Sequence, residues 1–169
     1  MNPLDIIAKY YPVGSEAYRI LVIHSRSVAD KALAIARMHP EMNLDLTFVE
    51  EAAMLHDIGI FRCNAPDIDC HGDAEYICHG YLRHARVCER HTGTGITLAM
   101  IEERGLPLPH RDFMPETLEE QLICYADKFY SKTKLDKEKS VEKVKQGLSK
   151  YGNETVERFD NWCKLFLGE

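Results

Sequence analysis

The segment from residue 16 to residue 38 constrains the fold more than any other part of this sequence. Small and apolar side chains recur in it every three or four residues, which is the spacing of one face of an α-helix. The members of this face are Ala17, Ile20, Leu21, His24, Val28, Ala32 and Ile35. We expect the face to be buried against other helices. His24 lies on it, so its imidazole should point into the core rather than to solvent.

The remaining sequence predicts further helices and no strand. Helices are expected to begin at Pro3, at the capping-box sequence that starts with Thr47, and at a second capping box that starts with Thr117. Gly59 is the expected C-terminal stop of the helix that starts at Thr47. The other expected helices span residues 76–91, 97–104, 140–151 and 153–167. Because no segment alternates with period two, the sequence predicts an all-α fold.

Length and composition point to an ordinary globular chain. The 169 residues are 45% hydrophobic and 28% charged, which suits a single domain over residues 1–169. Its core should span about 16–133, with C-terminal helices at about 140–167. The net charge of −6 argues against stable nucleic-acid binding. Without a membrane-length apolar run or a signal-peptide pattern, we expect a cytoplasmic protein with no membrane partner and with reduced thiols.

A His-Asp pair ends the helix that starts near Thr47. His56 and Asp57 are followed by Ile58 and Gly59, so both side chains stand at a helix end, where neighbours can serve one site. A buried Asp beside a buried His would be costly unless something neutralised it. A divalent metal would do so, because it accepts an imidazole nitrogen and a carboxylate oxygen together.

Two other residues strengthen the metal interpretation. His24 lies on the buried face described above, and Asp127 stands in an otherwise apolar helix. Each has an ordinary explanation by itself, since a core His is often hydrogen-bonded and a buried Asp is often ion-paired. A helical bundle can, however, bring three inward-facing helices to one point. The combined pattern therefore indicates a metal site in the bundle core.

These residues resemble a known family. His24, the block His56-Asp57-Ile58-Gly59 and the block Ala126-Asp127-Lys128 are similar to motifs of the HD-domain metal-dependent phosphohydrolases, over about residues 18 to 133. The resemblance implies an HD-domain helical bundle in which His24, His56, Asp57 and Asp127 bind metal. The segments from Glu89 to Ile96 and from Leu106 to Glu120 look closer still to small uncharacterised HDIG-domain hydrolases.

Family members with two metals have further histidines between the His-Asp pair and the last Asp. His79 and His91 match those positions, in an arrangement similar to that of bacterial dinucleoside tetraphosphate hydrolases. The spacing departs from the family, because a straight helix over 79–91 would separate the two Cα atoms by about 18 Å. Either the segment bends or one histidine is not a ligand, and His84 is an alternative. One or two ions are therefore expected.

The resemblance implies hydrolysis of a phosphate ester or anhydride, of a nucleotide in particular, by metal-activated water. Iron, manganese, cobalt and zinc all suit mixed His and carboxylate ligands. His56 and Asp57 would be catalytic, and Lys128 would be a third catalytic residue that contacts substrate phosphate. Further candidate phosphate contacts, with surface charge as the alternative, are Arg62, Arg90, His110 and Arg111.

Several alternatives stay open at this level. A structural zinc could be bound by Cys63, Cys70, His71, Cys78 and His79, although the spacing lacks a zinc-knuckle pair, whereas Cys88, Cys124 and Cys163 are simplest as core residues. The chain could instead be a non-catalytic nucleotide- or partner-binding module, or a di-iron oxygenase of the same fold. Trp162 and Phe166 could pack on the bundle or form a homodimer contact.

Overall fold

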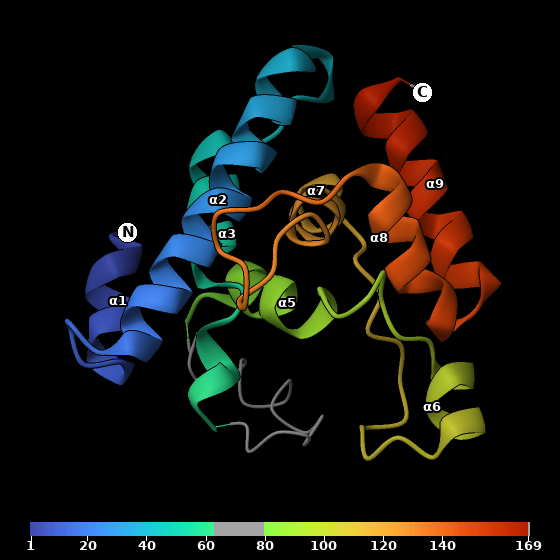
Figure 1. Ribbon diagram of the computed structural model, residues 1–169, viewed down its shortest axis with the longest axis horizontal. Coiled ribbons are helices and arrows are strands. Elements are labelled where there is room, and N and C mark those ends of the chain that lie inside the picture. The colour runs from blue at the N-terminus through green and yellow to red at the C-terminus, as the bar shows by residue number, and fades with distance from the viewer. Residues whose placement is uncertain (63–79, 169) are drawn as a thin grey trace.

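A computed structural model of the protein describes residues 1–62 and 80–168 (Figure 1). These residues form helices, turns and loops but no strand, so the all-α prediction is confirmed. The α-helices are α1 (Pro3–Tyr10), α2 (Glu16–Met38), α3 (Leu46–Leu55), α5 (Leu82–Arg90), α6 (Leu98–Arg104), α7 (Leu118–Asp127), α8 (Val141–Leu148) and α9 (Asn153–Leu167). Short 3-10 helices span Pro40–Met42, Ile58–Arg62 and Ser149–Tyr151.

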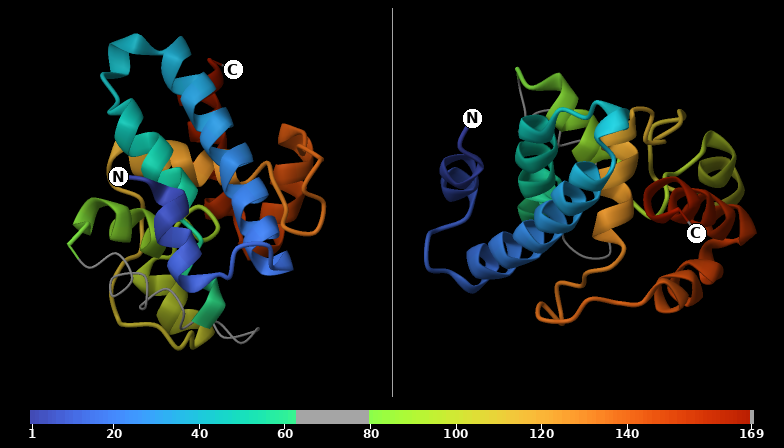
Figure 2. Two further views of the ribbon diagram at one scale, coloured as in Figure 1. Left: turned by 90° about the vertical axis from the view of Figure 1, so that its left-hand side faces the viewer. Right: turned by 90° about the horizontal axis from the view of Figure 1, so that it is seen from above.

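Helix α7 occupies the middle of the molecule. Helices α2 and α3 lie on one side of it and α8 and α9 on the other, while α5 crosses below (Figure 1). The long α2 runs alongside α3 and also contacts α7, as two further views show (Figure 2). This arrangement brings one end each of α3, α5 and α7 to the inner face of α2, which is where the candidate site forms.

The core is built from the helix faces that the sequence predicts. Val28 and Ala32 of α2 are fully buried. On the far side of α7, the ring of Tyr125 stacks on Phe159 of α9, with the two ring centroids 5.2 Å apart. Trp162 and Phe166 are also buried in this layer. The C-terminal helix therefore packs on the bundle through the residues for which a dimer contact was the alternative.

Two predicted helix ends are wrong. Helix α3 begins at Leu46, because the carboxylate of Asp45, not the Thr47 hydroxyl, accepts from the main-chain N–H of Phe48. The chain leaves α3 after Leu55 and continues into the 3-10 helix Ile58–Arg62, so Gly59 is not its C-terminal stop. A short polar side chain can cap only the N–H groups two or three residues after it. Asp45 is in position to cap the N–H groups of the first turn, so the helix begins directly after it.

The segment predicted as a helix over 76–91 is helical from Leu82 to Arg90. Gly80 has a φ of +92°, a left-handed conformation that interrupts a helix, and Tyr81 precedes α5 without providing a side-chain cap. Residues 76–79 lie outside the described residues. At Thr117 the prediction is confirmed, since its hydroxyl accepts from the main-chain N–H of Glu120 and α7 starts at the next residue.

None of the helices that the structure describes combines the length and the apolar character required to cross a bilayer.

Candidate metal centre

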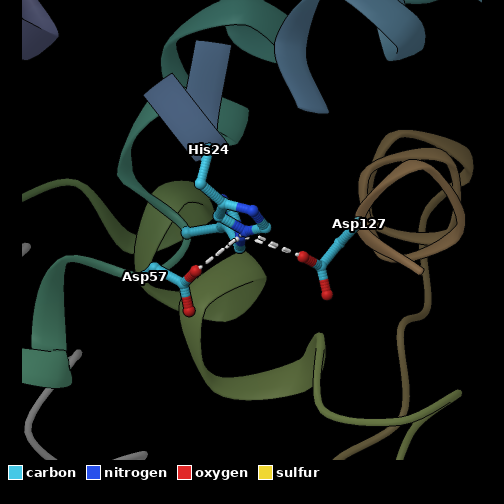
Figure 3. Close-up of side chains that lie close together, drawn as sticks. His24, Asp57 and Asp127 are labelled. Atoms are coloured by element: carbon cyan, nitrogen blue, oxygen red, sulfur yellow. Dashed lines mark ion pairs between the residues drawn. The ribbon is translucent and has the colours of Figure 1, made fainter. Parts of the chain in front are cut away.

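Three helices deliver four side chains to one point. His24 comes from the middle of α2, His56 and Asp57 follow the last residue of α3, and Asp127 is the last residue of α7. Figure 3 shows the imidazole of His24 between the carboxylates of Asp57 and Asp127. The two residues after α3 can share this site because the chain turns there from an α-helix into a 3-10 helix.

The four side chains are close enough to share an ion. One ligand atom from each of His24, His56, Asp57 and Asp127 lies within 4.8 Å of the others. His24 Nε2 lies 3.2 Å from Asp57 Oδ2 and 3.1 Å from Asp127 Oδ1. His56 Nε2 lies 3.1 Å and 3.4 Å from the same two oxygens. Neighbouring ligands that each stand about 2.1 Å from an ion are separated by roughly 3.0 to 3.4 Å, so these spacings fit one metal.

The hydrogen bonds around the cluster leave ligand atoms facing inward. His56 Nδ1 donates to the carbonyl oxygen of Ala53 at 2.6 Å, which leaves the Nε2 lone pair directed at the cluster. Within the described part of the chain, His24 Nε2, His56 Nε2 and Asp57 Oδ2 are buried and form no hydrogen bond of normal geometry, although Asp57 Oδ2 has an ion-pair contact with Lys132. Buried polar atoms are rarely left unsatisfied. A coordinated cation would satisfy all three at once.

The electrostatics of the cluster also suit a cation. Burial by itself would lower the pKa of His56, but the carboxylates of Asp57 and Asp127 outweigh it and raise the pKa to about 10. Burial would raise the pKa of Asp57, yet the nearby imidazoles hold it well below its usual range. Without metal, a proton on His56 therefore balances part of the negative charge. A divalent ion would replace that proton.

Two lysines border the carboxylates. Lys128 Nζ donates to Asp127 Oδ2 at 2.7 Å and to the carbonyl oxygen of His91 at 2.9 Å, so it ties the end of α7 to the end of α5. Lys132 Nζ lies 2.7 Å from Asp57 Oδ2. Sequence reasoning missed Lys132 because it stands in the irregular segment between α7 and α8, where no periodicity indicates the direction of a side chain.

His91 stands at the edge of the cluster, whereas His84 faces elsewhere. His91 Nδ1 donates to the carbonyl oxygen of Cys88 at 2.8 Å, and its Nε2 lies 3.3 Å from Asp57 Oδ1, the oxygen turned away from His24 and His56. His84 Nε2 lies 3.4 Å from Glu51 Oε2. His79 lies outside the described residues. For a second ion, the described residues thus bring together His91 and one oxygen of Asp57.

Two of the three arginines considered as phosphate contacts, Arg90 and Arg111, are paired with carboxylates. Arg90 Nη1 lies 2.9 Å from Glu116 Oε2 and 3.3 Å from Glu120 Oε2. Arg111 forms a close ion pair with Glu89. His110 is largely exposed, with a neighbouring carboxylate 3.9 Å away. The side chain of Arg62 lies outside the described residues.

The six cysteines fall into two groups: three are buried in the core, and three lie outside the described residues. Cys88, Cys124 and Cys163 are buried, as expected of core residues. Burial raises the pKa of the Cys124 thiol to about 12, which keeps it protonated and unreactive. The zinc alternative falls on Cys63, Cys70, His71, Cys78 and His79, which lie outside the described residues.

Comparison with known proteins identifies relatives that match most of the chain. Over 118 residues, the chain is 35% identical to the protein named "Uncharacterized protein MJ0778" of Methanocaldococcus jannaschii. This match covers 68% of each of the two chains. This chain belongs to the same family. It is also 32% identical over 139 residues to a tRNA (cytidine(56)-2'-O)-methyltransferase of Picrophilus torridus, and 32% identical over 130 residues to the protein of that name from Thermoplasma volcanium.

The match to the two methyltransferases is unequal in extent. It covers 81% and 76% of this chain but 37% and 35% of theirs, so the chain spans about a third of their length. No protein-family model matches the chain. No solved structure matches it either.

These relatives overturn the expected family and activity. They are named for methyl transfer to tRNA, so the interpretation as an HD-domain phosphohydrolase that acts on a small nucleotide is wrong, and the binding-module and oxygenase alternatives find no support. The physical reason is that a His and Asp ligand set identifies a metal site rather than a reaction, and one fold hosts many reactions.

The expectation of no nucleic-acid partner is also contradicted, because the relatives' names include tRNA. It rested on the net charge of the whole chain, which hides a local excess. Between residues 128 and 150 the sequence has eight lysines and three acidic residues. A local cluster of this kind, not the overall charge, is the signal that could have indicated RNA.

Proposed function

We propose that this chain takes part in the 2'-O-methylation of tRNA, as a helical unit that binds tRNA beside a divalent metal ion. The observation that carries the proposal is the similarity to two proteins named for that reaction, which extends over 81% and 76% of this chain. A tRNA partner agrees with the cytoplasmic location that the sequence predicts.

The ligand cluster supports the metal part of the proposal. His24, His56, Asp57 and Asp127 would hold the ion, which by ligand type would be iron, manganese, cobalt or zinc. A divalent ion supplies a Lewis acid that lowers the pKa of a coordinated water or hydroxyl. The protein holds its ligands in place through second partners, such as the carbonyl oxygen of Ala53 on His56.

The surrounding residues have roles that follow from their contacts. Lys128 is engaged with Asp127 and the main chain at His91, so we assign it the positioning of Asp127 rather than a direct contact with substrate. Lys132 reaches Asp57 from a more exposed position. A ribose hydroxyl or phosphate at the cluster would therefore meet ammonium groups next to the carboxylates.

The proposal is tested by binding and by methylation, measured separately. Protein purified without chelator is mixed with unmodified tRNA and labelled S-adenosylmethionine, and cytidine 56 is examined for a 2'-O-methyl group by mass spectrometry. Binding of the same tRNA is measured by filter retention. Transfer by this chain alone would place the reaction within it, and binding without transfer would assign it the RNA-binding part. Absence of both would overturn the proposal.

A further inference from the structure

A pocket of about 420 Å³ opens directly beside the ligand cluster. It lies between the segment after α7, helix α8 with the 3-10 helix that follows it, and the turn at Gly93. Its lining includes Asp127, which also belongs to the cluster, so a molecule in the pocket lies next to the metal centre. The charged residues of the lining are Asp127, Lys128, Lys139, Lys143 and Lys150.

The charge of this lining is unbalanced. Asp127 is paired with Lys128, which leaves three ammonium groups from Lys139, Lys143 and Lys150 without a carboxylate among the lining residues. Three like charges around one hollow repel each other unless an anion lies between them. The unbalanced charge is local, since the chain as a whole carries a net charge of −6.

Two of the acidic side chains near these lysines, Glu138 and Asp160, are paired with other residues. Glu138 precedes Lys139 in the chain, but its carboxylate pairs with Lys31 at 2.6 Å and accepts from the hydroxyl of Tyr130. Asp160 of α9 pairs with Lys145 at 2.6 Å, on a different face of α8 from Lys143. Neither carboxylate therefore neutralises the pocket.

Lys139 is held in place by the protein. Its Nζ donates to the carbonyl oxygens of Lys128 and Tyr130, both at 3.2 Å. An ammonium group has three N–H donors, so one remains for a ligand. Burial is the main cause that lowers the pKa of Lys139; the carboxylate of Asp127 acts in the opposite direction, and Lys128, Lys132 and Lys143 lower it further.

An apolar pocket adjoins the charged one. It has a volume of about 290 Å³, shares Gly93 and Tyr151 with the lysine pocket, and is lined further by Ile96, Met100 and Leu106. A free phosphate ion has no apolar group that could contact such a surface. A nucleotide of RNA has a base that could contact it, because single-stranded RNA is bound through its phosphate and through the apolar and aromatic contacts of its base.

We propose that Lys139, Lys143 and Lys150 bind a backbone phosphate of RNA in this pocket and thereby place the RNA strand next to the metal centre. The inference rests on the proposed function for its choice of RNA as the source of the phosphate. The chemistry itself rests on three lysines, Lys139, Lys143 and Lys150, that line one pocket.

The test compares two triple variants that remove the same charge. Lys139→Gln, Lys143→Gln and Lys150→Gln are combined in one protein, and Lys134→Gln, Lys137→Gln and Lys164→Gln in the control, whose three lysines are exposed and outside the pocket. Affinity for unmodified tRNA is measured over a range of salt concentrations. We expect the pocket variant to bind about tenfold or more weakly at about 0.1 M salt, with a shallower salt dependence, and the control to change less than about threefold.

A second measurement separates the pocket from its RNA ligand. Pyrophosphate is titrated into the ¹⁵N-labelled protein, and the amide signals of residues 143–151 are followed. Selective shifts that vanish in the pocket variant would support the phosphate site. If wild-type protein binds tRNA and both triple variants weaken it equally, the pocket is overturned while the proposed function stands. If wild-type protein shows no tRNA binding, RNA is overturned as the ligand, even where pyrophosphate binds. The single variant Lys143→Gln repeats the test with less change to the fold.

Discussion

His24 Nε2 lies 3.1 Å from Asp127 Oδ1, although the two residues stand on different helices, α2 and α7. That approach closes the candidate site, because His56 and Asp57 reach the same point from α3. The packing of α7 against α2 thus determines whether the four ligands meet. A protein that holds these atoms together without a hydrogen bond at His24 Nε2, within the residues described, is organised for a cation.

Replacing Asp57 should abolish metal binding. Its carboxylate oxygen Oδ2 contacts both imidazoles of the cluster, at 3.2 Å from His24 Nε2 and 3.1 Å from His56 Nε2. Because changes to outer partners of a metal site already cost about 10- to 100-fold in affinity, Asp57→Ala should cost more than about 100-fold. Isothermal titration with zinc and with manganese measures the loss.

Asp136→Ala is the matched control for this variant. Asp136 is exposed in the segment between α7 and α8, so the same substitution there should leave metal affinity unchanged. Far-ultraviolet circular dichroism should show the helices of both variants intact. Undiminished metal binding by Asp57→Ala would remove the proposed centre from this position.

His91 should tune the centre without adding a second ion. Its Nε2 contacts Asp57 Oδ1, the oxygen that does not face the other imidazoles. His91→Ala should therefore weaken the binding of one ion by about tenfold, which is typical for the loss of a residue that contacts a metal ligand. The stoichiometry should stay at about one ion per chain. Elemental analysis and titration measure the two quantities. A fall from about two equivalents to about one would instead make His91 a ligand of a binuclear site.

The fold was predictable where one local signal dominates. Helix α2 spans Glu16–Met38 as predicted, because Ser15 caps it and its buried face repeats without interruption. Helix α5 was predicted too long, since apolar residues before Leu82 resemble a helix face while the left-handed Gly80 breaks it. Periodicity records which side chains are apolar and does not record a backbone interruption.

The candidate site was predictable in its ligand types and not in its surroundings. His24 and Asp127 could be singled out because polar side chains on apolar faces need a reason. Lys132, Lys139 and Lys143 could not, because their grouping depends on the path of the segment between α7 and α8. The reaction could not be predicted from the sequence either, since the same metal ligands occur in enzymes that catalyse different reactions.

Metal binding should depend on pH through His56. In the metal-free protein its folded-state pKa of about 10 exceeds the ordinary value of 6.5. The protonated form therefore stabilises the metal-free fold fully below pH 6.5, and this contribution is lost as the pH rises through about 10. A metal requires the neutral imidazole, so affinity should rise by about tenfold per pH unit between about pH 7 and pH 9.

Proton release gives a direct measure of this coupling. At about pH 7 each bound ion should displace about one proton, which is found from binding enthalpies in buffers of different ionisation enthalpy. His110→Gln serves as a control, because His110 is exposed and lies outside the cluster. Binding enthalpies that do not depend on the buffer would show that His56 is already neutral before the metal binds.

Two neighbouring glycines should differ sharply in their tolerance of alanine. Gly93 and Gly95 both have positive φ angles, +59° and +98°, so each substitution forces an L-residue into the left-handed region. A Cβ atom on Gly93 would meet nothing within 4 Å, whereas one on Gly95 would lie 2.5 Å from Met114 Sδ and 2.9 Å from Pro115 Cδ. Gly95→Ala therefore adds a steric clash to the backbone strain.

The difference can be measured by urea denaturation. Gly93→Ala should lower the free energy of unfolding by about 1 kcal/mol through backbone strain alone. Gly95→Ala should lower it by about 2 to 4 kcal/mol, because Met114 and Pro115 must also move. Since both glycines line the apolar pocket, tRNA affinity at a temperature where both variants are folded separates a local effect from lost stability. Equal destabilisation by the two substitutions would contradict the close packing of Gly95 against Met114.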